Sequence, residues 1–364
     1  MLFGYPIEAT NDNWLHECLC AAIVAIHSNI DSDNNYPQWP AILPNEYQQR
    51  LSASTGLRDH LEGYARELRK LSKTNHDHIL QAIADQNKIP ELLSGGCDCA
   101  IIDDLPRPIQ PCITKLFIYA FNKLKDLGVR DSHYAQIYAS IPHKVCPFCG
   151  IEYMDAPDAR REDLDHYLPK SIYPLAAANL RNLVPMGHKC NSKYKLSTDL
   201  LHKSDGTRRV AFDPYDHTKI SVLLDDSEPF DGEDCNLPKW VVRFDPDTSA
   251  ATTWDEVFEI RARYCRDHLN PSYKKWLQDF RSWSRSANMM GNTDALIVEA
   301  LRRYETFNVE CGMQDRAHLK AAVFRMLRLH CEAGNRRLLN MIGDLIVGTP
   351  EKPAKINPDP RLRL

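Results

Sequence analysis

The sequence predicts an α+β protein in which a central segment with short strands lies between two helical regions. Apolar residues recur at helical spacing within 11–30, 57–71 and 109–127. Between 209 and 244 there are short runs rich in β-branched and aromatic residues, separated by Asp, Gly and Pro, which is typical of small strands. The helical spacing returns in successive stretches over 254–346.

These changes of pattern predict four parts. An N-terminal helical region covers 1–140, a core with a β extension covers 141–250, and a C-terminal helical region covers 251–350. The proline-rich residues 351–364 are predicted to be a disordered tail. With 364 residues, 43% of them hydrophobic, the chain can bury a sizeable core.

Composition excludes several classes of protein. No run approaches the roughly 18 apolar residues of a membrane span, and the N-terminus has no secretory pattern, so a cytoplasmic protein without membrane contact is expected. The 12 cysteines are therefore predicted to be reduced. The chain has no GxxxxGK[ST] phosphate loop, so any ATPase activity would belong to a partner chain.

Charge is distributed unevenly along the chain. The net charge of −4 argues against a protein that coats nucleic acid by bulk electrostatics. Between Arg160 and Arg209, however, ten Lys and Arg residues stand against five Asp and Glu residues. This local basic segment favours contact with phosphate.

The same segment carries chemically informative residues. Cys146 and Cys149 form a C-x-x-C turn, which presents two thiolates to one zinc ion. Asp165 and His166 follow, and Asn191 comes later, directly after a further cysteine. A carboxylate, an imidazole and an amide are the groups needed to hold one hard divalent cation and to deprotonate a water beside it.

The order C-x-x-C, D-H-x-x-P-x-S, N-L-x-P, C-N-x-x-x-K is similar to that of the HNH endonucleases, over about 50 of the 364 residues. The resemblance implies a ββα-metal core that hydrolyses DNA phosphodiester bonds with Mg²⁺ or Mn²⁺ and is stapled by Zn²⁺. By the same resemblance His166 is the general base, Asp165 and Asn191 bind the catalytic metal, and Asn182 braces the loop between them.

Lysines of this segment are predicted to contact the phosphates of the substrate. Lys193 and Lys195 lie near the first turn of the helix expected after Cys190, where anions bind favourably. Lys170 belongs to the basic segment next to the proposed base.

The zinc staple leaves its fourth ligand open. Zinc-stapled relatives usually bring two further cysteines three residues apart, and here Gly187 stands where the partner of Cys190 is expected. His188 is the nearest candidate, and His143 or a water molecule are the alternatives. The three expected thiolate ligands are Cys146, Cys149 and Cys190.

The same residues are compatible with two other functions. A zinc-stapled module could bind nucleic acid without cutting it, and an RNA-directed nuclease would use the same motif. The helical flanks exceed what a self-contained nuclease needs, which suggests regulation, autoinhibition or docking to another chain. The overall layout resembles stand-alone HNH nucleases of bacterial anti-phage defence systems of the Zorya or Septu type, whose complexes would supply such partners, for example an ATPase.

Overall fold

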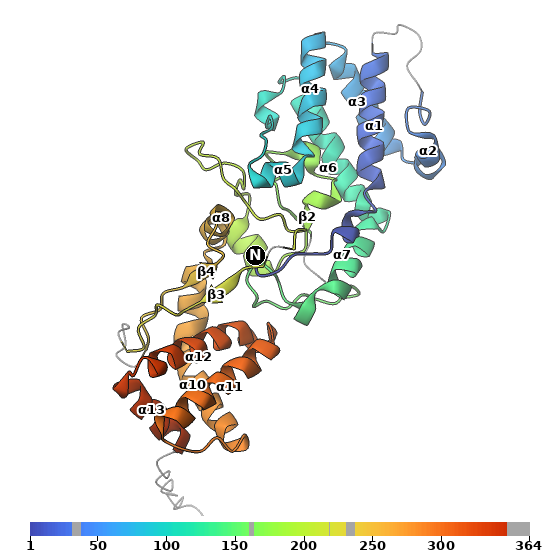
Figure 1. The fold of residues 1–364 in the computed structure, drawn as a ribbon. Coiled ribbons are helices and arrows are strands. Elements are labelled where there is room, and N and C mark those ends of the chain that lie inside the picture. The colour runs from blue at the N-terminus through green and yellow to red at the C-terminus, as the bar shows by residue number, and fades with distance from the viewer. Residues whose placement is uncertain (31–37, 160–163, 218, 231–236, 348–364) are drawn as a thin grey trace, which may run out of the picture. The chain divides into compact units, whose positions relative to one another are not determined.

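The computed structural model describes residues 1–30, 38–159, 164–217, 219–230 and 237–347 (Figure 1). It is 59% helical, and its strands form two small sheets of two strands each within those residues. The predicted α+β class is confirmed at this level. The predicted tail at 351–364 and the basic residues Arg160 and Arg161 lie outside the described residues.

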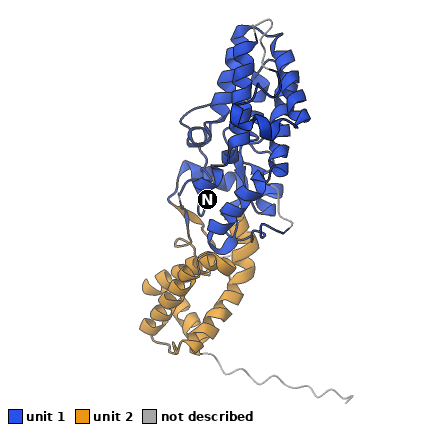
Figure 2. Cartoon of the chain, turned by 90° about the vertical axis from the view of Figure 1, so that its right-hand side faces the viewer, with its two compact units in different colours: residues 1–221, 246–260 blue, residues 222–245, 261–364 orange. Residues whose placement is uncertain are grey.

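The chain divides into two compact units (Figure 2). Unit 1 contains residues 1–221 and 246–260, and unit 2 contains residues 222–245 and 261 onward. The N-terminal helices and the segment with the candidate site therefore share one unit, although the change of sequence pattern near residue 140 had predicted separate regions.

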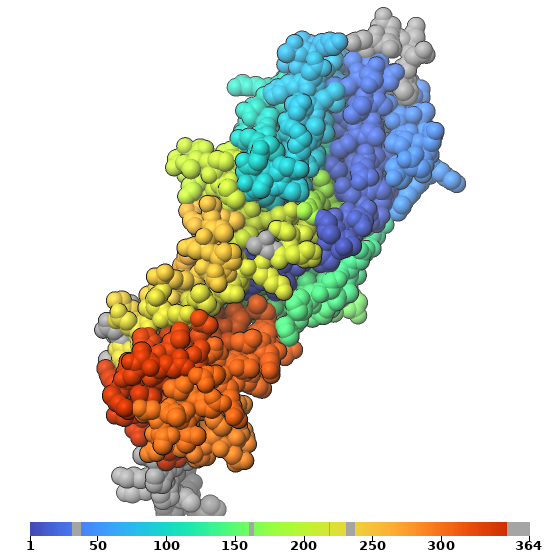
Figure 3. Space-filling model, in the orientation of Figure 1, coloured from blue at the N-terminus to red at the C-terminus, as the bar shows by residue number. Residues whose placement is uncertain are grey.

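The N-terminal part of unit 1 is a group of packed helices. Their bounds are α1 Trp14–Asn29, α2 Asn45–Leu51, α3 Thr55–Leu68, α4 Lys73–Gln86, α5 Ile89–Ser94, α6 Gln110–Asp126 and α7 Val129–Ser140. The predicted helices within 11–30, 57–71 and 109–127 correspond to α1, α3 and α6. Helices α1 and α4 lie side by side on the face that Figure 3 shows, and α3 packs against α6.

Helix α6 connects these helices to the candidate site. Its buried face carries Leu116, Phe117, Ala120 and Phe121 at helical spacing, and it packs against the short 3₁₀ turn Pro174–Ala176. The Phe121 ring lies 4.3 Å from the His166 ring, measured between centroids. The N-terminal helices therefore form one wall around the proposed base.

The central segment contains a short hairpin and a helical turn. Strand β1, Asp165–His166, pairs antiparallel with β2, Leu183–Val184, so that Asp165 lies opposite Val184 and His166 opposite Leu183. The chain then enters a helical segment, Cys190–Lys195, with π-type hydrogen bonding. Helix α8, Ser249–Phe258, completes unit 1 and packs against this segment.

The predicted β extension is placed differently from the expectation. Strands β3, Ser221–Leu223, and β4, Arg243–Asp245, form the second sheet, and most of their residues belong to unit 2 rather than to the unit with the candidate site. Tertiary contacts explain the difference, because Arg325 donates hydrogen bonds to Asp225. Unit 2 thus anchors the segment between the two strands.

The helices of unit 2 follow the predicted spacing closely. Their bounds are α9 Ile260–Arg263, whose first residue still belongs to unit 1, α10 Asn270–Ser286, α11 Asp294–Glu310, α12 Ala317–Glu332 and α13 Arg336–Val347. An aromatic cluster of Phe280, Trp283, Tyr304 and Phe324 joins α10, α11 and α12, with centroid distances between 4.6 and 6.3 Å. No helix among the described residues is long and apolar enough to cross a bilayer.

Candidate metal centre and hydrolytic site

Three buried cysteines converge in unit 1. The sulfur atoms of Cys146, Cys149 and Cys190 all lie within 4.8 Å of one another. The C-x-x-C turn is held by the Gly150 amide, which donates to the Cys146 carbonyl at 2.7 Å, and Gly150 adopts a φ of 65° that a residue with a side chain rarely takes. Among the described residues, these cysteines are the group of His, Cys, Asp and Glu side chains placed to hold a metal.

The electrostatics of this cluster favour a cation. Burial raises the pKa of Cys146 well above its ordinary value, and the neighbouring Cys149 and Cys190 raise it further. A soft divalent ion reverses this, because it takes thiolates as ligands and compensates their charge. The Gly187 amide also donates to Cys146 Sγ at 3.3 Å, an interaction that supports a thiolate. The residues present therefore fit a zinc ion.

The two histidines considered as fourth ligands do not join the thiol cluster. His188 is exposed, and it lines a cavity of about 170 Å³ together with Glu152 and Gly187. His143 is half-buried, and neither histidine belongs to the group of ligand atoms that includes the three sulfurs. The structure thus leaves the fourth position without either histidine.

The hairpin and the helical segment after it are joined by a buried lysine. Lys195 Nζ lies 2.7 Å from Asp165 Oδ2 and donates to the His166 carbonyl oxygen at 2.8 Å. The Lys195 side chain has 0% of its surface exposed. The expectation that Lys195 contacts phosphate does not fit this placement, because its ammonium group is occupied inside the protein. A pattern of basic residues cannot distinguish an exposed lysine from one buried by a partner carboxylate.

His166 is buried and held in one orientation. It is 7% exposed, and its Nε2 lies 3.1 Å from the Ala177 carbonyl oxygen. Because a carbonyl only accepts, Nε2 carries the proton of the neutral ring and Nδ1 keeps its lone pair. Burial, together with the charges of Lys170, Lys195 and Arg130, lowers the pKa of His166 to about 3. The ring is therefore neutral at pH 7.

Asn182 holds the loop that follows His166. Its Oδ1 accepts from the Leu168 amide at 2.7 Å, and its Nδ2 donates to the carbonyl oxygens of Leu168 and Ala176 at 3.0 and 3.3 Å. The side chain is fully buried. It therefore has the hydrogen bonds expected of a brace between the loop and the hairpin.

Two cationic side chains lie near His166, against the Phe121 ring of α6. The Lys170 ammonium lies 5.3 Å from the centre of the Phe121 ring, and the Arg130 guanidinium lies 4.8 Å from the same centre. Lys170 is exposed and Arg130 is half-buried. Arg130 was not predicted from the sequence, since it lies in α7, outside the motif, and only the fold brings it to Phe121.

Asn191 and Lys193 lie in the helical segment that starts at Cys190. The backbone N–H of Asn191 donates to the Gly187 carbonyl at 3.0 Å, and the backbone carbonyl of Asn191 accepts from the N–H of Leu196, five residues later. Asn191 is half-buried and Lys193 is exposed. Of the predicted substrate contacts, Lys170 and Lys193 are therefore available at the surface.

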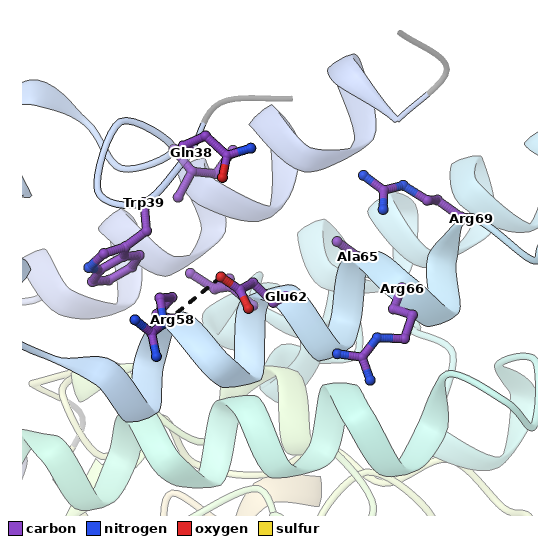
Figure 4. Close-up of a pocket in the computed structure, with 9 residues that line it drawn as sticks. Gln38, Trp39, Arg58, Glu62, Ala65, Arg66 and Arg69 are labelled. Atoms are coloured by element: carbon purple, nitrogen blue, oxygen red, sulfur yellow. Dashed lines mark ion pairs between the residues drawn. The ribbon is translucent and has the colours of Figure 1, made fainter. Parts of the chain in front are cut away.

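A separate cavity lies among the N-terminal helices, away from the predicted site residues. It has a volume of about 290 Å³, and Trp39 and the α3 residues Arg58, Glu62 and Arg66 are among its lining residues (Figure 4). Arg58 is paired with Asp59 at 2.8 Å and lies 3.9 Å from Glu62. Acidic neighbours thus offset part of its positive charge.

Comparisons with known proteins gave no match: no family model, no curated protein and no solved structure matches this chain.

Proposed function

We propose that this chain is a metal-dependent endonuclease of the HNH type that hydrolyses phosphodiester bonds of DNA. The observation that carries the proposal is the β1–β2 hairpin with Asp165 and His166 on β1, tied through Lys195 to the helical segment that bears Asn191. This is a two-stranded unit followed by a helix, with the predicted base, the predicted carboxylate ligand and the predicted amide ligand on its parts.

His166 is the general base in this proposal. The bond from Nε2 to Ala177 fixes the ring and leaves Nδ1 free to accept a proton from an attacking water. A pKa of about 3 keeps the ring neutral but makes it a weak base. Burial is the largest cause of this low pKa, and a phosphodiester beside Lys170 and Arg130 would offset only the part of the lowering that their charges contribute.

Asp165 and Asn191 are the proposed ligands of a catalytic Mg²⁺ or Mn²⁺. Oδ2 of Asp165 is engaged by Lys195, and a carboxylate offers further lone pairs on Oδ1. Asn191 and Lys195 are four residues apart in one helical segment, so both side chains lie on nearly the same face of it. Oxygen ligands of this kind suit a hard ion, which stabilises negative charge on the phosphate and on the leaving oxygen when it is bound.

A structural Zn²⁺ at the three cysteines is proposed to hold the framework of the site. Cys190 is the first residue of the helical segment with Asn191, and Cys146 belongs to the turn that precedes the hairpin. A metal between them would fix where the helix begins relative to β1.

Plasmid nicking tests the function. Purified protein should convert supercoiled plasmid to open-circular or linear DNA in Mg²⁺ or Mn²⁺, and EDTA should stop the reaction. His166→Ala should slow cleavage by at least roughly 10²-fold, the low end for loss of a general base. His78→Ala is the matched control, because His78 is an exposed residue of α4, a helix that carries none of the predicted site residues.

The result separates the competing functions. Retained DNA binding with no cleavage in any divalent ion would support a zinc-stapled binding module and reject the nuclease. Cleavage of RNA but not DNA would support an RNA-directed nuclease. Cleavage by His166→Ala at the wild-type rate would reject the assigned base.

A role as the nuclease effector of a bacterial anti-phage defence system belongs to the same proposal. Unit 2 carries none of the predicted site residues, which suits a unit that docks another chain, such as an ATPase, or restrains the nuclease. Such a role would place the chain in the cytoplasm with DNA as its substrate. Co-expression with neighbouring genes and a phage-plating assay, with His166→Ala as the inactive control, test this step.

A further inference from the structure

Glu152 fills the space that a side chain at position 187 would occupy. A Cβ atom built on Gly187 would lie 2.6 Å from Glu152 Oε2 and 3.0 Å from Glu152 Cβ. The first distance is shorter than real Cβ atoms show and the second is tight, so a cysteine at 187 would require the Glu152 side chain to leave its present position. Zinc-stapled HNH proteins usually carry a cysteine at this position. Here the residue is Gly187, and the acidic side chain of Glu152 fills the space beside it.

The Glu152 carboxylate is held on one side and bare on the other. Its Oε1 accepts from the Lys189 amide at 3.0 Å, one residue before Cys190. Its Oε2 is buried and makes no hydrogen bond in the described part of the protein. A buried carboxylate oxygen without a donor is costly, and a cation is the usual partner of such a group.

The backbone of Glu152 also belongs to the thiol turn. The Cys146 amide donates to the Glu152 carbonyl at 2.8 Å, and Val145 pairs with Tyr153 in an antiparallel bridge. Gly187, next to the carboxylate, donates to Cys146 Sγ at 3.3 Å. Glu152 is thus tied by hydrogen bonds to both halves of the thiol cluster.

We propose that Glu152 supplies the fourth ligand of the zinc ion, through Oε2, in a site of three thiolates and one carboxylate. Zinc in structural sites is tetrahedral, and a carboxylate oxygen is one of its ordinary ligands, at about 2.0 to 2.2 Å. In the structure the Glu152 carboxylate does not belong to the group of ligand atoms that lie within 4.8 Å of one another, so ligation requires the side chain to turn towards the sulfurs. Gly187 leaves the room for this side chain.

Zinc X-ray absorption of the full-length wild-type protein is the first test. The fit should require three sulfur neighbours near 2.3 Å and one oxygen near 2.0 to 2.2 Å, with no imidazole scattering. Four sulfurs, or an imidazole in place of the oxygen, would overturn the proposal. This measurement does not depend on nuclease activity, so it separates the zinc ligand from the proposed function.

Substitutions give a second, independent test by zinc retention against a competing chelator. Glu152→Gln and Glu152→Ala should weaken zinc retention at least about tenfold. That is the smallest loss expected when a residue that merely hydrogen-bonds to a metal ligand is removed, and loss of a ligand itself should cost no less. Asp155→Asn, an exposed acid in the same loop, should retain zinc like the wild type. His188→Ala should also retain it, and loss of zinc from that variant alone would assign the position to His188 instead.

A paired exchange tests the shared space directly. Gly187→Cys alone should displace the Glu152 carboxylate, because the new Cβ would lie 2.6 Å from its Oε2. Glu152→Ala with Gly187→Cys should regain zinc and show four sulfur neighbours by X-ray absorption. Two results together would show that Glu152 is not a ligand. The two single Glu152 variants would hold zinc like the wild type, and the double variant would bind zinc no better than Glu152→Ala.

Discussion

The Nζ atom of Lys195 lies 2.7 Å from Oδ2 of Asp165, inside the protein, where one end of the hairpin meets the following helical segment. The lysine is fully buried and the aspartate side chain is 13% exposed. Desolvation raises the pKa of Asp165 even though Lys195 opposes the shift. The ion pair therefore carries a desolvation cost that only the presence of both partners offsets.

Lys195→Met should destabilise unit 1 by about 3 to 5 kcal/mol, because it leaves the Asp165 charge buried without a partner. The measurement is urea unfolding at pH 7. Lys195→Met combined with Asp165→Asn should recover part of the loss, since the uncompensated charge is removed. Lys193→Met, two residues away and exposed, is the control and should change stability by roughly 0.5 kcal/mol or less. Equal stability of the two single variants would contradict the structural role given to Lys195.

Asn191→Ala should separate the two metals. Loss of an oxygen ligand should raise the Mg²⁺ concentration needed for cleavage at least about tenfold, while zinc per chain stays unchanged because thiolates hold that ion. Mg²⁺ titration of plasmid cleavage and elemental analysis of the same sample measure both effects. Ser192→Ala, the exposed neighbour, should match the wild type. Zinc loss in Asn191→Ala would show that the division of ligands is wrong.

Lys170→Ala and Arg130→Ala should weaken DNA binding by a similar factor for every DNA sequence. Each removes one cation near Phe121, so the slope of log affinity against log salt should fall by about 0.9 for each phosphate that is no longer neutralised. Fluorescence anisotropy across a salt series, in the His166→Ala background to prevent cleavage, provides the measurement. Lys203→Ala is the control, because Lys203 is already paired with Glu256 at 2.7 Å. An unchanged slope in both variants would place the phosphate elsewhere.

His16 should make the fold sensitive to acid. Burial lowers the pKa of His16 to about 4, and a hydrogen bond with Asn87 opposes the shift. Between pH 6.5 and about 4 the unfolded chain binds a proton that the folded chain does not, so stability falls as pH falls, by up to about 1.4 kcal/mol per pH unit. Urea unfolding at pH 7, 6 and 5 should show a shallower decline for His16→Gln. His78→Gln, an exposed control, should keep the wild-type decline.

Regular apolar spacing predicted most of the helices, and α4 shows where that signal failed. Its buried face includes His76 and Gln86, which are polar. His76 bonds to the Leu68 carbonyl, and Gln86 bonds to the Ala100 carbonyl and the Leu175 amide. Because their partners come from elsewhere in the chain, no local pattern could identify these residues as buried.

The candidate site was predictable in its composition but not in its surroundings. The motif identified His166 and Asn182 as candidates, and the structure shows that Asn182 makes hydrogen bonds to the loop after His166, whereas the bond from His166 to Ala177 was not predicted. The burial of Lys195, the approach of Arg130 and the collision between Glu152 and position 187 depend on how distant segments pack. These features arise from tertiary contacts between distant segments, and a local sequence motif does not contain that information.

The hydrogen bonds around the thiol cluster have a consequence for the order of biosynthesis. The Tyr5 hydroxyl donates to the Pro185 carbonyl, 180 residues later, and the Trp254 indole donates to the Phe148 carbonyl, 106 residues earlier. Cys146 and Cys149 are therefore synthesised before Cys190 and Trp254, the residues that later enclose them. Such long-range closure is slow, so the half-formed thiol pair is exposed to stray metals and oxidants during translation. Yield of active protein should then depend on zinc supply while the chain is being made.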